Sequence, residues 1–308
     1  MKKSTVTSIL MVFLLGFASC SSEPEQPGGN PEPTPTPTPP APGEKIEILI
    51  SPALQSRATD YGFEQNDRIG LYVVNYDGAT AGALKNSGNH VDNMGFTYSG
   101  SWTADTPIYW KDETSHADFY LYYPYSSQIS SVSALAFDVK ADQSNEAAYK
   151  ASDLMIGRAK NVAPTSAAIS IPVSHVMSRI TVKVDAGNGF TAESLAASQI
   201  GVKINGLKCK STVDLSTSSV TPAGDAVSMT PLSGKDSYTA LVVPQTVAEG
   251  NLITVNVDGH DYNLKKEFTF ESGKNHTFTV VISKTSNGIN VDINPWQNDG
   301  TDNGGVAE

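Results

Sequence analysis

Apolar and polar side chains alternate along most of the chain after residue 45, which is the period of a half-buried β-strand. Ile180, Val182 and Val184, for example, are separated by Thr181 and Lys183. The segments with this alternation, or with a denser apolar run, are 46–50, 69–74, 119–123, 180–184, 253–257, 268–270, 278–282 and 289–293. Many short segments of this kind predict an all-β protein.

Clusters of Gly, Asn, Asp and Ser separate the predicted strands and are typical of turns. They lie at residues 185–189, 257–261, 271–275 and 285–288, and the last two are interpreted as short hairpin loops. Helix is expected only in short stretches such as residues 192–198, because no long amphipathic pattern is present.

The length of the chain indicates two domains. The part after residue 45 has roughly 265 residues, about twice the size of a seven-stranded β-sandwich. A Pro-Thr-Ser interruption at residues 164–166 separates two groups of predicted strands. We therefore expect one β-sandwich over residues 45–165 and a second over residues 166–308, which ends in a short polar tail.

The N-terminus has the layout of an export signal. Lys2 and Lys3 precede an apolar run at residues 9–17, and two small residues then precede Cys20. The run has about nine residues, whereas a membrane-spanning helix needs roughly twenty, so residues 1–19 are interpreted as a removable signal. The small residues before Cys20 resemble the lipobox of bacterial lipoproteins, which implies that Cys20 is acylated and held in outer-membrane lipid. An ordinary secretory signal with an incidental Cys20 is the alternative.

Residues 20–44 form a predicted tether. They contain no large apolar residue after Cys20 and repeat Thr-Pro steps, which favour an extended, solvated backbone that builds no core. Glu23 and Glu25 resemble the surface-export signals of some Gram-negative anaerobes. The tether therefore predicts a folded body held at the outer face of the cell.

The charge argues against nucleic-acid binding, and the cysteine content argues against an internal disulfide. The formal net charge is -11, and loss of Lys2 and Lys3 with the signal would take it to -13, which argues against nucleic acid as a partner. Cys209 is the only cysteine besides Cys20, so the body has no internal disulfide and depends on packing. Cys209 is interpreted as an ordinary small strand residue, and a thiol pKa lowered by the lysines on both sides of it is the alternative.

The sequence lacks the usual catalytic and metal-binding motifs. Its five histidines are scattered, and it contains no HExxH, glycine-rich phosphate loop or G-x-S-x-G elbow. We therefore expect no enzyme activity, no cofactor and no metal site. The densest polar cluster, Asp112, Glu113, His116 and Asp118, is interpreted as a solvated acidic turn, with cation binding as the alternative.

Aromatic residues are concentrated between residues 109 and 125. They are Tyr109, Trp110, Phe119, Tyr120, Tyr122, Tyr123 and Tyr125. An exposed group of this size would suit stacking against sugars, whereas strand alternation turns about half of it inward. The alternative function is therefore a glycan-binding surface lipoprotein of a polysaccharide-uptake system.

Seven short segments follow one another along the body: SRATD at 56–60, FEQNDRIGLY at 63–72, PIYW at 107–110, DFYLYYPY at 118–125, SDLM at 152–155, HVMSRI at 175–180 and INPW at 293–296. In this order, behind an export signal, they resemble the fimbrillin family. Asn66 departs from that family, which usually has glycine there. The resemblance implies a pair of transthyretin-like β-sandwich domains.

The resemblance also implies a structural and adhesive role as a building block, anchor or tip of surface fimbriae. Other fimbrial subunits and host or bacterial surface receptors are the implied partners. In this family a trypsin-like protease removes the first strand after an arginine. Here cleavage between Arg57 and Ala58 would release the alternating segment at residues 45–54. In a tip or anchor, Arg57 would instead be a solvated loop residue and the strand would stay in place.

The groove left by the first strand would then accept a strand from the next subunit. An alternating strand satisfies both the unpaired backbone groups and the apolar slot of such a groove. The candidate donor strand contains Ile289, Val291 and Ile293. The alternative is that these residues form the ordinary final strand of the second sandwich.

Overall fold

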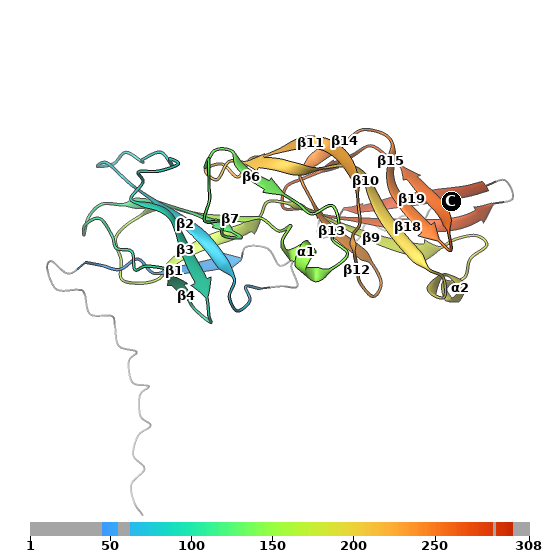
Figure 1. Ribbon diagram of the computed structural model, residues 1–308, viewed down its shortest axis with the longest axis horizontal. Helices are drawn as coiled ribbons and strands as arrows, with labels where there is room; N and C mark the ends of the chain where they lie inside the picture. Colours follow the sequence, from blue (N-terminus) through green and yellow to red (C-terminus); the bar gives the residue numbers. More distant parts are fainter. Residues whose placement is uncertain (1–44, 55–61, 286–287, 298–308) are drawn as a thin grey trace, which may run out of the picture. The chain divides into compact units, whose positions relative to one another are not determined.

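The computed structural model describes residues 45–54, 62–285 and 288–297, and these residues are almost entirely β (Figure 1). They all lie in one compact unit, residues 39–308. The all-β prediction is confirmed. The division into two sandwich domains near residue 165, and their transthyretin-like type, stay predictions.

The first sheet contains seven strands in the order β1-β8-β7-β5-β2-β3-β4. The strand at one end, β1, pairs in parallel with β8, and the other described neighbours pair antiparallel. In this order the strands are β1 (Ile50–Leu54), β8 (Ile169–His175), β7 (Met155–Val162), β5 (Ala117–Tyr123), β2 (Arg68–Asn75), β3 (Val91–Tyr98) and β4 (Trp102–Ala104).

The later strands form two five-stranded sheets and one strand pair. One sheet has the order β11-β10-β15-β16, with β6 also paired to β10, and the other has the order β12-β13-β9-β18-β19. The strands are β6 (Leu135–Asp138), β9 (Ser178–Ala186), β10 (Ile200–Val213), β11 (Val220–Met229), β12 (Leu232–Ser233), β13 (Tyr238–Val242), β15 (Asn251–Val257), β16 (His260–Lys265), β18 (Asn275–Thr285) and β19 (Gly288–Gln297), and the pair is β14 (Gln245–Val247) with β17 (Phe268–Phe270). Because β6 pairs with β10, a strand that precedes residue 165 joins a sheet of later strands.

Two short helices interrupt the strands. The predicted one is α2 (Ala192–Ala196), which begins after Thr191, whose hydroxyl accepts a hydrogen bond from the Ser194 N–H. The other, α1 (Glu146–Lys150), was not predicted from the sequence and is capped by Asn145. Five residues are too few to produce a helical apolar pattern, so only the cap could have indicated it.

The central strands β2 and β5 of the first sheet are buried on both faces. Ile69, Leu71 and Val73 on one face belong to one hydrophobic cluster, while Tyr72 and Val74 on the other face belong to a second cluster that also contains residues of the later strands. A strand that is covered on both faces has no polar face. The apolar runs at residues 69–74 and 119–123 are therefore denser than simple alternation.

One predicted hairpin is wrong. Residues 271–275 lead from β17 to β18, but β17 pairs with β14, and β18 pairs in parallel with β9. Turn residues indicate that the chain reverses, not which strand it then meets. The other hairpin is confirmed, because β18 and β19 pair antiparallel from Thr285 and Gly288 outwards.

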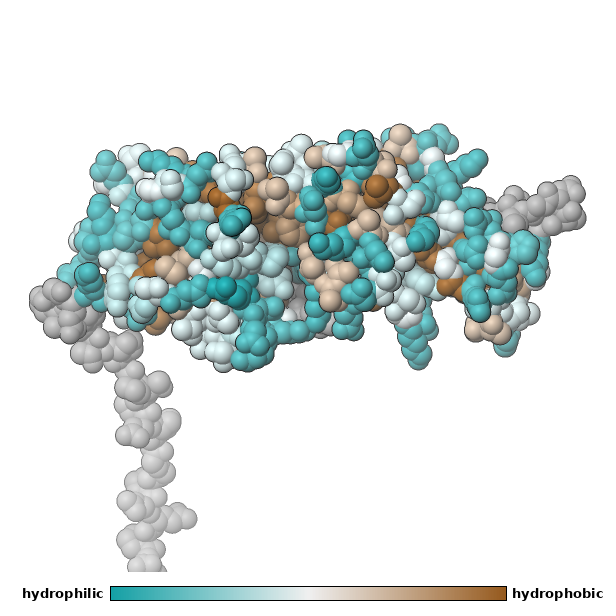
Figure 2. Space-filling model, viewed as in Figure 1, coloured by the Kyte–Doolittle hydropathy of each residue, from teal (hydrophilic) through white to brown (hydrophobic). Residues whose placement is uncertain are grey.

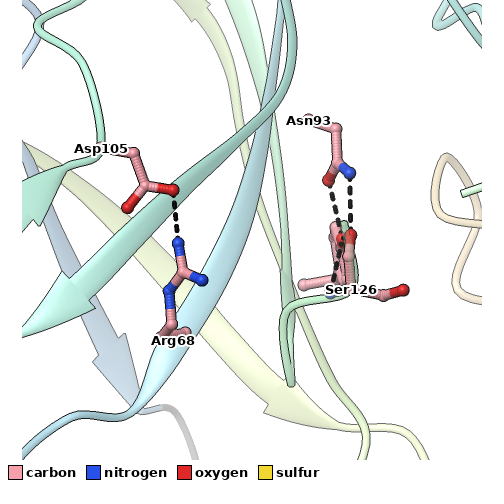
Figure 3. Close-up of polar contacts among 5 residues, drawn as sticks. Arg68, Asn93, Asp105 and Ser126 are labelled. Carbon is pink, nitrogen blue, oxygen red and sulfur yellow. Dashed lines mark hydrogen bonds and ion pairs between the residues drawn. The ribbon is translucent and has the colours of Figure 1, made fainter. Parts of the chain in front are cut away.

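Steric constraints explain the residue types at several positions of the segments that resemble a family. A side chain at Gly70 would overlap the ring of Tyr122 on the neighbouring strand. The Tyr122 hydroxyl donates to Asn93 Oδ1 at 2.7 Å, and Asn93 Nδ2 donates to the Ser126 carbonyl at 2.8 Å (Figure 3). Asn66 has a φ of 73°, a region that glycine and asparagine adopt most readily. Asparagine can therefore replace the usual glycine there.

Figure 3 also shows the ion pair between Arg68 and Asp105, which crosses the backbone of β3 at Gly95. A Cβ at Gly95 would collide with both charged groups. The Arg68 guanidinium lies 4.5 Å from the centroid of the Tyr125 ring. Because both partners are about half exposed, the pair contributes little to stability.

Replacing Gly70 by alanine tests the packing of β2 against Tyr122. We expect Gly70→Ala to lower the free energy of unfolding by about 1–3 kcal/mol, because the methyl group overlaps the ring. Gly201→Ala is the matched control, since the nearest atom to its Cβ is the Asn256 Cβ at 3.9 Å. The control should stay within about 0.5 kcal/mol of the parent in urea unfolding. Equal losses in the two variants would contradict the steric explanation.

Candidate functional site

Residues 46–54, here called the N-terminal segment, are hydrogen-bonded on one side over residues 49–54 and on the other side over residues 46–48. On one side, β1 pairs with β8 over all five of its residues. On the other side, the Ile48 N–H donates to the Ile108 carbonyl at 2.8 Å, and the Trp110 N–H donates to the Ile46 carbonyl at 2.9 Å. The segment therefore lies between two pieces of backbone that are distant in the sequence.

The side chains of the N-terminal segment alternate as predicted. Ile48 is 2% exposed and Ile50 is 6% exposed, and both belong to the cluster on the Ile69 face of the first sheet. Leu49 is 43% exposed and points outward between them. The segment thus contributes isoleucines to a core and leaves its other face in solvent.

The space that this segment fills is here called the acceptor groove. Its walls are β8 and residues 108–110. The cluster that contains Ile48 and Ile50 also includes Ile69, Leu71, Phe119, Ile169 and Ile171. Without the segment, the Ile108 carbonyl and the N–H groups of Trp110 and Ile169 would lose their hydrogen-bond partners. The groove can therefore bind an alternating strand through backbone pairing and apolar burial.

Side-chain contacts hold the second wall in place. The Trp110 indole Nε1 donates to the Thr165 carbonyl at 3.1 Å, and its ring meets Phe119 edge-on at a centroid distance of 5.6 Å. The His90 Nε2 lies 2.7 Å from the Tyr109 carbonyl. None of these contacts involves the N-terminal segment, so the wall does not depend on it for these bonds.

Pro52 fixes which side of the segment faces β8. The Ile169 N–H donates to the Leu49 carbonyl at 2.9 Å, so in a parallel pair the odd-numbered residues of the segment bond to β8 and the even-numbered ones face away. Pro52 is even-numbered, and its missing N–H removes no bond to β8. Proline is therefore compatible with the groove in this register, and a shift by one residue would leave a β8 carbonyl unpaired.

Three of the predicted site residues lie outside the described residues. They are Cys20, Arg57 and Ala58. Arg57 is three residues beyond Leu54, the last residue of β1, so cleavage there would release the whole segment. Within the described ranges, no helix has the length and apolar character needed to cross a membrane.

The candidate donor strand forms the edge of the last sheet. Ile289, Val291 and Ile293 lie in β19, whose backbone pairs with β18, while their side chains lie outside what the structure describes. This position agrees with an ordinary final strand, which was the alternative. The donor role stays a prediction.

A match between the first and last strands was overlooked in the sequence. Residues 46–52 read IEILISP and residues 289–295 read INVDINP. Both have isoleucine or valine at the first, third and fifth positions and proline at the seventh. An alignment of the chain with itself would have found this signal.

Polar contacts join the segments that resemble a family. Asp153 accepts a hydrogen bond from His175 across 2.7 Å, and the Tyr123 hydroxyl donates to Asp67 at 3.1 Å. Burial, followed by the nearby Asp67 carboxylate, raises the pKa of Tyr123. These four residues line a cavity of about 270 Å³ together with Phe63. The segments thus meet in space as packing and hydrogen-bonding partners.

The polar side chains of the acidic cluster at residues 112–118 form hydrogen bonds with nearby residues of the protein. The Asp112 carboxylate accepts hydrogen bonds from Thr114 and Ser115, which hold its pKa well below the usual range. His116 Nδ1 lies 2.8 Å from Asn161 Oδ1, and buried Asp118 accepts from the Asn161 N–H. In the described part of the chain, no three His, Cys, Asp or Glu residues are grouped to hold a metal ion.

The structure agrees with Cys209 as an ordinary strand residue and not with a lowered thiol pKa. Cys209 lies in β10 and is half-buried. Burial, with a smaller contribution from Asp138, raises its pKa. Both effects disfavour the charged thiolate.

The aromatic group between residues 109 and 125 does not form an exposed platform. Trp110, Phe119, Tyr120 and Tyr122 are buried, and Tyr123 and Tyr125 are half-buried. Tyr109 is 39% exposed. More rings point inward than alternation predicted, because β5 is covered on both faces. Figure 2 shows the mixed polar and apolar surface of one face of the molecule.

Comparison with known proteins identifies a family and two relatives. The model of the family described as "Fimbrillin-like" matches residues 56–296. A Bacteroides ovatus protein named as a fimbrium tip subunit is 29% identical over 194 residues, which is 58% of this chain and 34% of that protein. A Bacteroides uniformis protein named as a fimbrium subunit is 25% identical over 272 residues, covering 82% of this chain and 84% of that protein. The chain thus spans about a third of the first relative and most of the second.

A crystal structure shares the fold. It is a cell adhesion protein from Bacteroides uniformis with a TM-score of 0.61 and 20% identity, and the match covers 82% of this chain and 99% of that one. At this identity the likeness concerns the fold alone.

Substitutions in the N-terminal segment test how it is held. We expect Ile48→Ala to lower the free energy of unfolding by roughly 2–5 kcal/mol, because it leaves a cavity in a core. Leu49→Ala, its exposed neighbour, should cost less than about 0.5 kcal/mol. Denaturant unfolding of the uncleaved protein measures both. Similar losses of stability in the two variants would contradict the alternating burial of the side chains of the segment.

Proposed function

Because the chain belongs to the fimbrillin-like family, we propose that it is a structural subunit of surface fimbriae, with other fimbrial subunits as its partners. The names of the two relatives, a fimbrium tip subunit and a fimbrium subunit, support this role. The role is adhesive and architectural rather than catalytic.

The proposed assembly mechanism is strand complementation in the acceptor groove. One observation carries it: the N-terminal segment is paired on both sides, and its isoleucines lie in a core. A strand held in this way is joined to the body by one covalent connection, and its other contacts with the body are non-covalent. Any strand with the same pattern could form those non-covalent contacts in its place. Replacement exchanges one set of backbone bonds and apolar contacts for an equivalent set.

Cleavage of the Arg57–Ala58 bond makes the segment replaceable. A trypsin-like protease adds water across this bond, which leaves a carboxylate on Arg57 and an amino group on Ala58. The segment is then held by non-covalent contacts alone and can dissociate. The groove that remains has unpaired backbone groups and an apolar floor, which favours binding of a new strand.

Delivery to the cell surface precedes assembly in this proposal. Residues 1–19 direct export, Cys20 carries the lipid that anchors the chain in the outer membrane, and residues 20–44 tether a body of two transthyretin-like sandwich domains that meet near residue 165. Cleavage after Arg57 separates that body from the lipid. The incoming strand comes from residues 289–293 of a neighbouring subunit.

Blocking the cleavage site tests the order of events. We expect Arg57→Gln to abolish cleavage by a trypsin-like protease and to prevent polymerisation, because the segment stays covalently attached. Lys45→Gln is the matched control, since it removes a basic residue on the other side of the segment and should leave both unchanged. N-terminal sequencing of subunits from surface filaments provides the measurement. Filament subunits that still begin at Cys20 would contradict cleavage and indicate a tip or anchor.

Removing the last strand tests the donor role. Deletion of the residues after Gly288 should abolish polymerisation and leave a folded monomer, because β19 is an edge strand. Electron microscopy and thermal unfolding measure the two effects. An unfolded truncated monomer would instead identify β19 as a required strand of its own sheet.

A further inference from the structure

Two adjoining hollows lie on strands that do not form the acceptor groove. The larger has a volume of about 590 Å³ and is lined by residues of β10, β12, β13, β15 and β16. The smaller has a volume of about 320 Å³ and is lined by residues of β9, β13 and α2. Ile200 and Tyr238 line both hollows, which therefore meet at these two residues. The pair of hollows is here called the Tyr238 groove.

One wall of the larger hollow is an unpaired stretch of strand edge. The Asp258 N–H donates to the Gln199 carbonyl at 3.1 Å, so in this antiparallel pair Gln199 faces β15. The backbone groups of Ile200 and Val202 then face away from β15, toward the hollow that both residues line. Over the described residues, β11 pairs with this side of β10 only from Ile204 onward. The wall therefore presents backbone donors and acceptors to a ligand.

The floor of the larger hollow is a glycine that packing does not require. A Cβ at Gly201 would meet no atom nearer than the Asn256 Cβ at 3.9 Å. The missing side chain thus leaves space above the sheet. The half-buried ring of Tyr238 stands beside this space, and its hydroxyl donates to the Ile200 carbonyl at 3.3 Å. An aromatic ring fixed in this way can pack against an apolar face of a ligand.

The charged side chains of the larger hollow are held by neighbours and retain bonding capacity. Asn256 Nδ2 donates to Asp261 Oδ1 at 2.6 Å, and Lys203 Nζ donates to Thr230 Oγ1 at 2.5 Å. The other carboxylate oxygen of Asp261 can accept a hydrogen bond, and Lys203 has two further N–H donors. Lys203 and Asp261 are the charged residues that line this hollow, so their charges balance.

We propose that the Tyr238 groove binds a neutral glycan chain. The hydroxyl groups of a sugar both donate and accept hydrogen bonds, which matches the mixture of groups in the larger hollow, and the C–H face of a sugar fits the Tyr238 ring. Two adjoining hollows fit consecutive sugar units. The balanced lining and the net charge of -11 disfavour an anionic glycan. The inference rests on the adhesive role proposed above and names its ligand.

An extended peptide fits this groove less well. Strand addition needs a free edge along several residues, and here the unpaired edge ends where β11 begins to pair at Ile204. The Tyr238 hydroxyl already bonds to the Ile200 carbonyl on that edge. The site also differs from the aromatic group at residues 109–125, most of which is buried.

Filling the floor of the groove tests the inference. The uncleaved protein is applied to an array of neutral, sialylated and sulfated oligosaccharides taken from polysaccharides and from glycoproteins, and the best neutral binder is titrated by calorimetry. Gly201→Val should weaken its binding by at least about tenfold, because the new side chain occupies the space of the ligand, and should leave urea unfolding unchanged. The array pattern identifies which of the two glycan sources is bound.

Gly250→Val is the matched control. A Cβ at Gly250 would meet nothing nearer than the Ala248 carbonyl oxygen at 3.8 Å, and Gly250 does not line the groove. Binding and unfolding should both stay unchanged. Asp261→Asn is a second test that does not depend on the folding of Gly201→Val. It replaces an exposed charged acceptor and should weaken binding by about tenfold.

The outcomes separate this inference from the proposed assembly. Binding of no neutral glycan, a preference for sialylated or sulfated glycans, or binding that survives both Gly201→Val and Asp261→Asn would overturn the inference. Electron microscopy of the protein cleaved after Arg57 reports assembly independently. Polymers without glycan binding would reject the glycan site and leave strand exchange standing, whereas glycan binding without polymers would support the site and reject strand exchange.

Discussion

The backbone of a buried strand needs a hydrogen-bond partner for each of its polar groups, and this requirement governs the region around residues 46–54. The segment bonds to β8 on one side and to residues 108–110 on the other, and its isoleucines complete a hydrophobic cluster. The segment thus supplies the strand at the end of the order of the first sheet. The proposed assembly by strand exchange uses the same requirement between molecules.

The segments that resemble the fimbrillin family contact one another through packing and hydrogen bonds and do not form a chemical site. Gly70 makes room for the Tyr122 ring, Tyr123 donates to Asp67, and Asp153 contacts His175. Each contact joins two of the segments across the fold. They hold the seven-stranded sheet together and so hold β8 and the Trp110 wall, which form the groove. The residues that position the binding site are thus different from those that would contact the bound strand.

The proposed recognition by strand pairing requires no reactive side chain. Main-chain groups supply most of the affinity in this mode, and alternate apolar side chains supply the specificity. The charged Asp112 carboxylate is satisfied by hydrogen bonds within its own loop, and burial raises the pKa of Cys209. The pattern that the proposed pairing would use is the spacing of three apolar residues and a proline, which occurs at both ends of the body.

The sequence by itself determined the strands, the alternation of the N-terminal segment and the family, because period-two patterns and short motifs are local. It could not determine which strands are neighbours: β17 meets β14 rather than β18, and β1 runs parallel to β8 across more than a hundred residues of chain. It also underestimated the burial of the aromatic residues in β5, since both faces of that strand are covered by elements distant in sequence. Pairing and burial depend on non-local contacts, and only the tertiary structure decided that residues 108–110 complete the groove.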